Sequence, residues 1–179
     1  MLIEPENSEL RDVLKIDEEK IEKVLKSAES KLVKSPIYNE NVRQKIFMTE
    51  SHGLYRFFVL SNYSFASTIP VIENIRVNKS RIEDDLVLRN TEEPNKRSLS
   101  GVIAHEVTHN QISRKFGLAK YRTIPTWKDE GYSEYIAGET TLSFDEGVKL
   151  WKEGESDSPH LAYFKYHQMV KYLLEKFVS

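Results

Sequence analysis

Residues 96–116 read KRSLSGVIAHEVTHNQISRKF, a stretch that combines helical periodicity with a cluster of ionisable side chains. Its apolar residues recur at helical spacing and would bury one face of a helix. They are Leu99, Val102, Ile103, Val107, Ile112 and Phe116. Gly117 follows directly and is expected to cap the helix in the left-handed conformation. The sequence therefore predicts one long helix over residues 96–116.

Two histidines and a glutamate lie inside this predicted helix, in the pattern HEVTH at residues 105–109. His105 and His109 are four residues apart, so both imidazoles project from one face and can bind one metal ion. Glu106 lies about 100° around the helix from His105, where it can reach a water on the metal without ligating the metal. Burying such side chains is costly unless something satisfies them. The motif therefore predicts a metal site with a carboxylate beside it.

The sequence before this helix changes from helical to strand-like character. Residues 8–34 carry apolar side chains at helical spacing, with a break expected near Asp17, and Pro36 ends the segment. Short stretches rich in β-branched and aromatic residues follow, separated by turn residues. The strands we expect are 43–50, 54–60, 69–77 and 85–89.

After residue 116 the pattern is helical again, and Thr126 is a suitable N-cap for the next helix. The helices we expect are 126–137, 144–153 and 160–178. The order of helix, strands and helices predicts an α+β fold with a small, mainly antiparallel sheet. A chain of 179 residues is long enough for one domain. Its expected parts are a helical N-terminal segment (1–35), a sheet (40–95) and the helices that carry the candidate site (96–179).

Composition excludes several classes of function. The net charge is −2, so no excess of basic residues exists to bind nucleic acid. The chain has no cysteine and five histidines, so a transition-metal site must use imidazole and carboxylate ligands. Apolar runs stop at four residues, and the N-terminus lacks the features of a signal peptide. We expect a cytoplasmic protein, or an extracytoplasmic domain trimmed of its targeting segment; the oligomeric state stays open.

A catalytic zinc site needs a third protein ligand in addition to His105 and His109. A metzincin would carry glycine and histidine at the positions of Ile112 and Lys115, so that class is excluded. A site with a cysteine ligand, as in peptide deformylase, is excluded as well. The remaining option is a glutamate on the following helix, which reads WKDEGYSEY over residues 127–135.

The pair of HEVTH and WKDEGYSEY resembles the gluzincin metallopeptidases, the group of thermolysin and aminopeptidase N, and is closest to the small peptidase-MA-like domains. The resemblance covers residues 97–173 well and implies a zincin-like fold. It implies that Glu130 is the third zinc ligand. It also implies that Glu134, one turn further on, orients His105 through its free ring nitrogen. Asp129 is a weaker candidate for the same kind of supporting contact, and we expect it to lie on the surface.

The resemblance further implies that a tyrosine or histidine near the C-terminus stabilises the oxyanion. Tyr163-Phe164-Lys165 is similar to the start of the Y-x-K-G-A stretch of aminopeptidase-like relatives, although the glycine and alanine are replaced. We therefore expect Tyr163 to be the donor. The alternatives are Tyr166, His160 and His167.

These features predict a zinc-dependent metallopeptidase with one zinc ion per chain and Glu106 as general base. A peptide or protein substrate would lie extended along an edge strand, for which residues 85–89 are the candidate. An endopeptidase is favoured because no segment resembles the amine-binding G-A-M-E-N of aminopeptidases. The alternative is a catalytically silent, zinc-containing peptide-binding or regulatory module. Such a module would more readily lose Glu106, which is present here.

Overall fold

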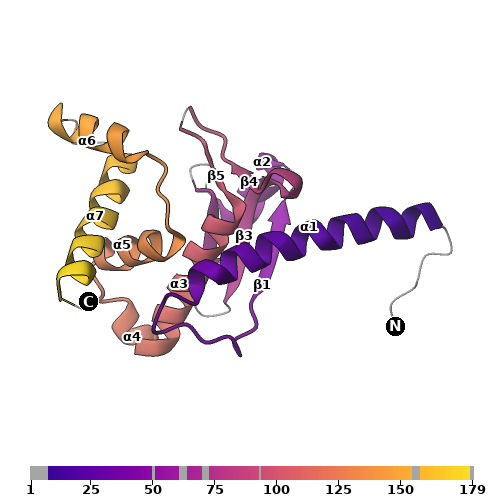
Figure 1. Ribbon diagram of the computed structural model, residues 1–179, viewed down its shortest axis with the longest axis horizontal. Helices are drawn as coiled ribbons and strands as arrows, with labels where there is room; N and C mark the ends of the chain where they lie inside the picture. The colour runs from indigo at the N-terminus through magenta and orange to yellow at the C-terminus, as the bar shows by residue number, and fades with distance from the viewer. Residues whose placement is uncertain are drawn as a thin grey trace.

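The computed structural model describes residues 8–49, 51–60, 64–69, 73–92, 94–154 and 158–177. Its helices are α1 (Ser8–Leu32), α2 (His52–Val59), α3 (Leu99–Phe116), α4 (Leu118–Tyr121), α5 (Thr126–Ala137), α6 (Phe144–Lys152) and α7 (Pro159–Phe177). Its strands are β1 (Lys45–Thr49), β2 (Ala66–Ile69), β3 (Asn74–Arg81), β4 (Leu86–Leu88) and β5 (Lys96–Ser98), with a 3-10 turn, η1 (Ile82–Asp84), between β3 and β4. Helix α5 lies beside α3 on the side away from the strands, and α7 lies beyond α5 (Figure 1).

The described strands form one small mixed sheet around β3. β1 runs parallel to β3, whereas β2 and β4 pair with β3 in the antiparallel sense, and β5 extends the sheet beyond β4. The expectation of a mixed helix–strand chain with a mainly antiparallel sheet is therefore confirmed. β4 is hydrogen-bonded on both sides, so the expectation that residues 85–89 form an edge strand is wrong. Among the described strands, β2 pairs with β3 alone.

Several expected helices form close to their expected bounds, including α5, α6 and α7. Helix α1 continues through Asp17 without the expected break, because neither proline nor glycine interrupts residues 8–32. Thr126 is the first residue of α5 rather than its cap, and Pro125 occupies the cap position without a side-chain hydrogen bond. Gly117 has a positive φ of 79°, but its ψ of 150° is not left-handed helical.

One expected strand is wrong, and one expected helix begins later than expected. Residues 54–59 belong to α2, and Leu60 caps its end, because the side chain of Ser51 accepts a hydrogen bond from the backbone of Leu54 and starts a helix. Residues 96–98 form β5 instead of the first turn of a helix. Ser98 then caps α3 by accepting a hydrogen bond from the backbone of Gly101 at 3.0 Å. The expected strand 69–77 is divided between β2 and β3, and residues 70–72 lie outside the described part of the chain.

Helix α3 is the centre of the molecule, and its side chains from Leu99 to Ser113 are buried. Its apolar side chains join those of α1 and the sheet in the main core cluster, which includes Val24, Ala28, Ile75, Val77, Val87 and Val102. On the other side, α5 packs against α3, and α7 packs against α5. A Cβ atom at Gly131 would lie 2.5 Å from the backbone oxygen of Tyr166, so glycine permits this close approach of α5 and α7. This packing brings α7 close to the helix that carries Glu130.

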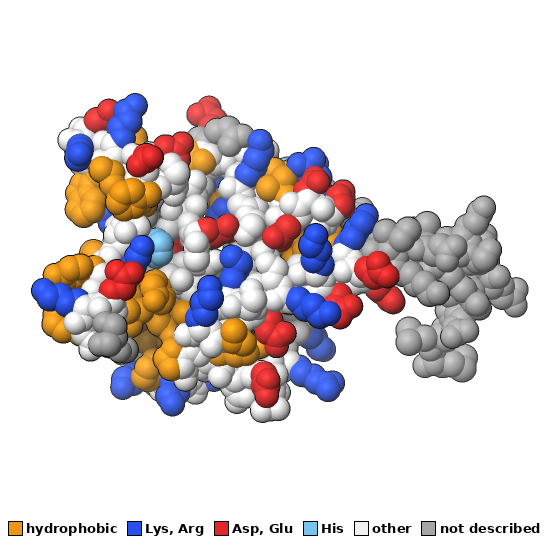
Figure 2. All heavy atoms as spheres, in the orientation of Figure 1, with side chains coloured by type: hydrophobic (Ala, Val, Ile, Leu, Met, Phe, Trp, Pro, Cys, Tyr) orange, Lys and Arg blue, Asp and Glu red, His pale blue; other side chains and the backbone are white. Residues whose placement is uncertain are grey.

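Charged side chains of both signs are interspersed over the face shown in Figure 2, and apolar side chains gather at the end formed by α6 and α7. The exposed apolar residues at this end include Phe144, Trp151, Tyr172, Leu173 and Phe177. In the part of the chain that the structure describes, no helix combines the length and the apolar character needed to cross a membrane.

Candidate metal centre

Three potential ligand atoms converge where α3 and α5 face each other. The Nε2 atoms of His105 and His109 are 3.0 Å apart. The Oε2 atom of Glu130 lies 3.3 Å from Nε2 of His105 and 3.6 Å from Nε2 of His109. His105 and His109 are buried, and Glu130 is half-buried. These three residues could hold one metal ion.

The spacing of the three atoms fits a tetrahedral zinc ion. Bonds of about 2.0–2.1 Å at tetrahedral angles place neighbouring ligand atoms about 3.3 Å apart. The three distances between the His105, His109 and Glu130 atoms scatter around that value. Two imidazole nitrogens and one carboxylate oxygen also form the kind of ligand set that leaves a fourth position open in catalytic zinc sites.

His109 is supported by a carboxylate at its other ring nitrogen. Its Nδ1 lies 3.0 Å from Oδ1 of Asp129, and the hydroxyl of Tyr121 donates to Oδ2 of the same carboxylate at 3.0 Å. The expectation that Asp129 lies on the surface is therefore wrong, since its side chain is only 16% exposed. A carboxylate that accepts the Nδ1 proton leaves the Nε2 lone pair directed at a metal. Tyr121, which reaches Asp129 from the short helix α4, was not predicted as a site residue.

A different carboxylate lies near the other ring nitrogen of His105. Oε1 of Glu134 lies 3.6 Å from Nδ1 of His105, slightly beyond hydrogen-bonding distance. Glu134 is 1% exposed, and Arg97 donates to both of its oxygens at 2.8 Å. Arg97 was not predicted as a site residue, because nothing in the local sequence of β5 marks it. The one available signal was that a buried glutamate needs a cation.

The electrostatics of the site favour positive charge between α3 and α5. Burial disfavours the charged form of His109, but hydrogen bonds and charge from Asp129 and Glu130 outweigh it and raise the pKa of this imidazole well above its ordinary value. Burial likewise opposes ionisation of Glu130, but hydrogen bonds from His105 and His109 hold the pKa of its carboxyl group far below its ordinary value. Asp129 and Glu130 thus stabilise a proton on His109.

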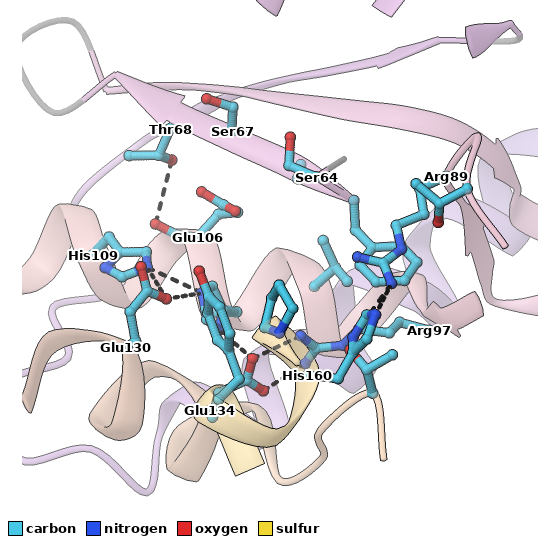
Figure 3. Close-up of a pocket in the computed structure, with 18 of the residues that line it drawn as sticks. Ser64, Ser67, Thr68, Arg89, Arg97, Glu106, His109, Glu130, Glu134 and His160 are labelled. Carbon is cyan, nitrogen blue, oxygen red and sulfur yellow. Dashed lines mark hydrogen bonds and ion pairs between the residues drawn. The ribbon is translucent and has the colours of Figure 1, made fainter. Parts of the chain in front are cut away.

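A cleft of about 880 Å³ opens over these residues. Glu106 lines it together with His105, His109 and Glu130, and the opposite wall is formed by residues 64–68, which include most of β2. Figure 3 shows Glu106 between the β2 side chains on one side and His109 with Glu130 on the other. The hydroxyl of Thr68 donates to the backbone oxygen of Glu106 at 3.4 Å, which ties β2 to α3.

Only some of the C-terminal candidates for oxyanion stabilisation line this cleft. Tyr163 and His160 line it, whereas Tyr166 and His167 are not among the described residues that do so. His160 receives a hydrogen bond from Arg89 at 2.6 Å. Tyr163 is 36% exposed, and burial together with nearby carboxylates raises the pKa of its hydroxyl, so that it remains a protonated donor at neutral pH.

No protein-family model, curated protein or solved structure matches this chain.

Proposed function

We propose that the chain is a zinc-dependent metallopeptidase of the gluzincin type, with His105, His109 and Glu130 as the metal ligands. The observation that carries this proposal is the triangle of Nε2, Nε2 and Oε2 atoms, which has the spacing of zinc ligands and lies in a cleft beside Glu106. Bound zinc would supply a water of lowered pKa and a Lewis acid for the scissile carbonyl.

Glu106 is the proposed general base. Glu106 is only 8% exposed and follows His105 directly on α3. Its carboxylate lines the cleft and is not one of the three converging ligands. From there its carboxylate takes the proton of the attacking water and delivers it to the nitrogen of the leaving amine. The zinc-containing module that lacks activity would have no need of a carboxylate in this place.

Tyr163 is the proposed oxyanion donor, because it is the C-terminal tyrosine that lines the cleft. A hydroxyl that acts mainly in the transition state contributes to kcat rather than to substrate affinity. Tyr163→Phe should therefore lower kcat about 100- to 1000-fold with little change in zinc content. Tyr166→Phe is the matched control on the same helix, and a large loss there with none at Tyr163 would transfer the role to Tyr166.

The proposed substrate is an extended peptide paired with the free edge of β2. This strand lines the cleft opposite α3 and, among the described strands, is hydrogen-bonded to β3 alone. An added peptide strand would satisfy its remaining backbone groups, as in other cases of strand addition. We propose cleavage of internal peptide bonds, since the sequence has no segment resembling the amine-binding stretch of aminopeptidases.

Zinc content measured together with turnover of a generic unfolded protein substrate tests the proposal. Wild-type protein should hydrolyse the substrate, and Glu106→Gln should bind zinc normally but lose hydrolysis, because the amide cannot accept the proton. Wild-type turnover by Glu106→Gln would show that Glu106 is not the base. A wild-type protein that holds zinc but hydrolyses nothing would favour the regulatory module instead.

A further inference from the structure

Arg97 occupies an unusual position for an arginine. It lies on β5, two residues before α3 begins, and its side chain is only 7% exposed. Its two terminal nitrogens donate to both oxygens of Glu134 at 2.8 Å, a paired arrangement that fixes the plane and the rotation of the carboxylate. Arginine is suited to this task because its guanidinium group is planar and rigid.

A second set of contacts ties Arg97 to the end of α5. Its guanidinium donates to the backbone oxygen of Glu139 at 3.2 Å, and its Nε lies 3.5 Å from the Glu139 carboxylate. That carboxylate packs against the first turn of α3, where a Cβ atom at Gly101 would lie 2.3 Å from it. Arg97 therefore joins the start of the helix that carries the two histidines to the helix that carries Glu130.

We infer that Arg97 is a positioning residue of the metal site, which holds the Glu134 carboxylate in place as the partner of His105. The inference rests on the proposed function, since it requires that His105 bind a metal. Oε1 of Glu134 faces Nδ1 of His105 at 3.6 Å. The same oxygen accepts a hydrogen bond from Arg97 (Figure 3). A Glu134 carboxylate released from Arg97 would lose its fixed direction, and His105 would lose the group that orients its ring.

The test is the zinc dissociation constant, measured by competition with a chelator on variants whose folding is verified by circular dichroism. Arg97→Gln should weaken zinc binding about 10- to 100-fold, the usual range for loss of an outer partner of a metal ligand. Arg97→Lys keeps the charge and loses the paired geometry, so its loss should be smaller but measurable. If Arg97→Gln does not fold, Arg97→Lys decides alone, and unchanged affinity in that variant overturns the inference.

A double-mutant cycle separates positioning from general stability. If Arg97 acts through Glu134, Arg97→Gln should change zinc affinity less than about threefold in a Glu134→Gln background. Independent, fully additive losses would overturn the inference. Arg114→Gln is the control, because it removes an ion pair with Glu73 from the same helix α3 away from the site and should leave zinc affinity unchanged.

The outcomes distinguish this inference from the proposed function. Wild-type zinc affinity in the Arg97 variants would remove the positioning role and leave the metallopeptidase proposal intact. A wild-type protein that binds no zinc would overturn both.

Discussion

The two histidines of the HEVTH motif lie on the same helix and offer the same ring nitrogen, but their supports differ. His109 is backed by Asp129 at 3.0 Å, and that carboxylate otherwise accepts from the neutral hydroxyl of Tyr121. His105 is backed by Glu134 at 3.6 Å, and that carboxylate is paired with the buried cation of Arg97. Among the described residues, the negative charge of Asp129 is shared with no cation other than His109, so it favours protonation or metal binding at that imidazole. The negative charge of Glu134 is balanced by Arg97, so this carboxylate contributes a fixed position beside His105 more than a charge.

The largest expected effect is on the free energy of unfolding, and it should differ between removal of Glu134 and removal of Asp129. Glu134→Ala would leave Arg97 buried without its main partner, so we expect it to lower the free energy of unfolding by about 3–5 kcal/mol. Asp129→Ala removes the hydrogen bonds to His109 and Tyr121, but Glu130 still faces His109, so a smaller loss of about 1–3 kcal/mol is expected. Denaturant unfolding of the metal-free variants measures both values. An equal or reversed order would mean that the two supports do not differ in the way described.

The second expected effect is a loss of zinc affinity when the carboxylate beside His109 is removed. Asp129→Ala should weaken zinc binding about 10- to 100-fold, because His109 loses the acceptor that fixes its Nδ1 proton and orients its ring. Chelator competition on the folded variant measures the loss. Zinc affinity unchanged from wild type would show that the Asp129 contact has no part in the site.

The third effect is a pH dependence carried by His109. Because its pKa is raised in the folded, metal-free protein, its contribution to stability is fully present below the unfolded value of about 6.5 and is lost as the pH rises through the raised pKa. Zinc must displace this proton, so zinc affinity should rise by up to about tenfold per pH unit above pH 6.5 until His109 is neutral. Asp129→Asn should shift that rise to lower pH, since it removes one carboxylate that holds the proton. A zinc affinity independent of pH from 6.5 to 8.5 in the wild type would contradict the assignment.

Sequence spacing predicted those features of the site that lie within a single helix. The four-residue interval placed His105 and His109 on one face of α3, and the helix 126–137 carrying Glu130 formed within its expected bounds. Asp129 was expected on the surface, and its burial depends on the approach of α3 and α4, which no local pattern shows. Arg97 could not be found locally, since 37 residues separate it from Glu134.

The wrong strand at 54–60 has a related cause. Its composition, with Tyr55, Phe57 and Phe58, is typical of a strand. The structure instead buries Tyr55 and leaves Phe57 and Phe58 exposed, which no pattern of alternation predicts. The hydroxyl of Tyr55 pairs with Ser64 at 2.7 Å, so a tertiary contact near the cleft, together with the Ser51 cap, favours the helix over local strand propensity.

The central claim is that His105, His109 and Glu130 together hold one zinc ion per chain. Elemental analysis of zinc-loaded, dialysed protein tests it most directly when wild type is compared with the His105→Ala, His109→Ala double variant. The geometry predicts one zinc per chain in the wild type and none in the double variant. Wild-type protein without zinc, or stoichiometric zinc in the folded double variant, would contradict it.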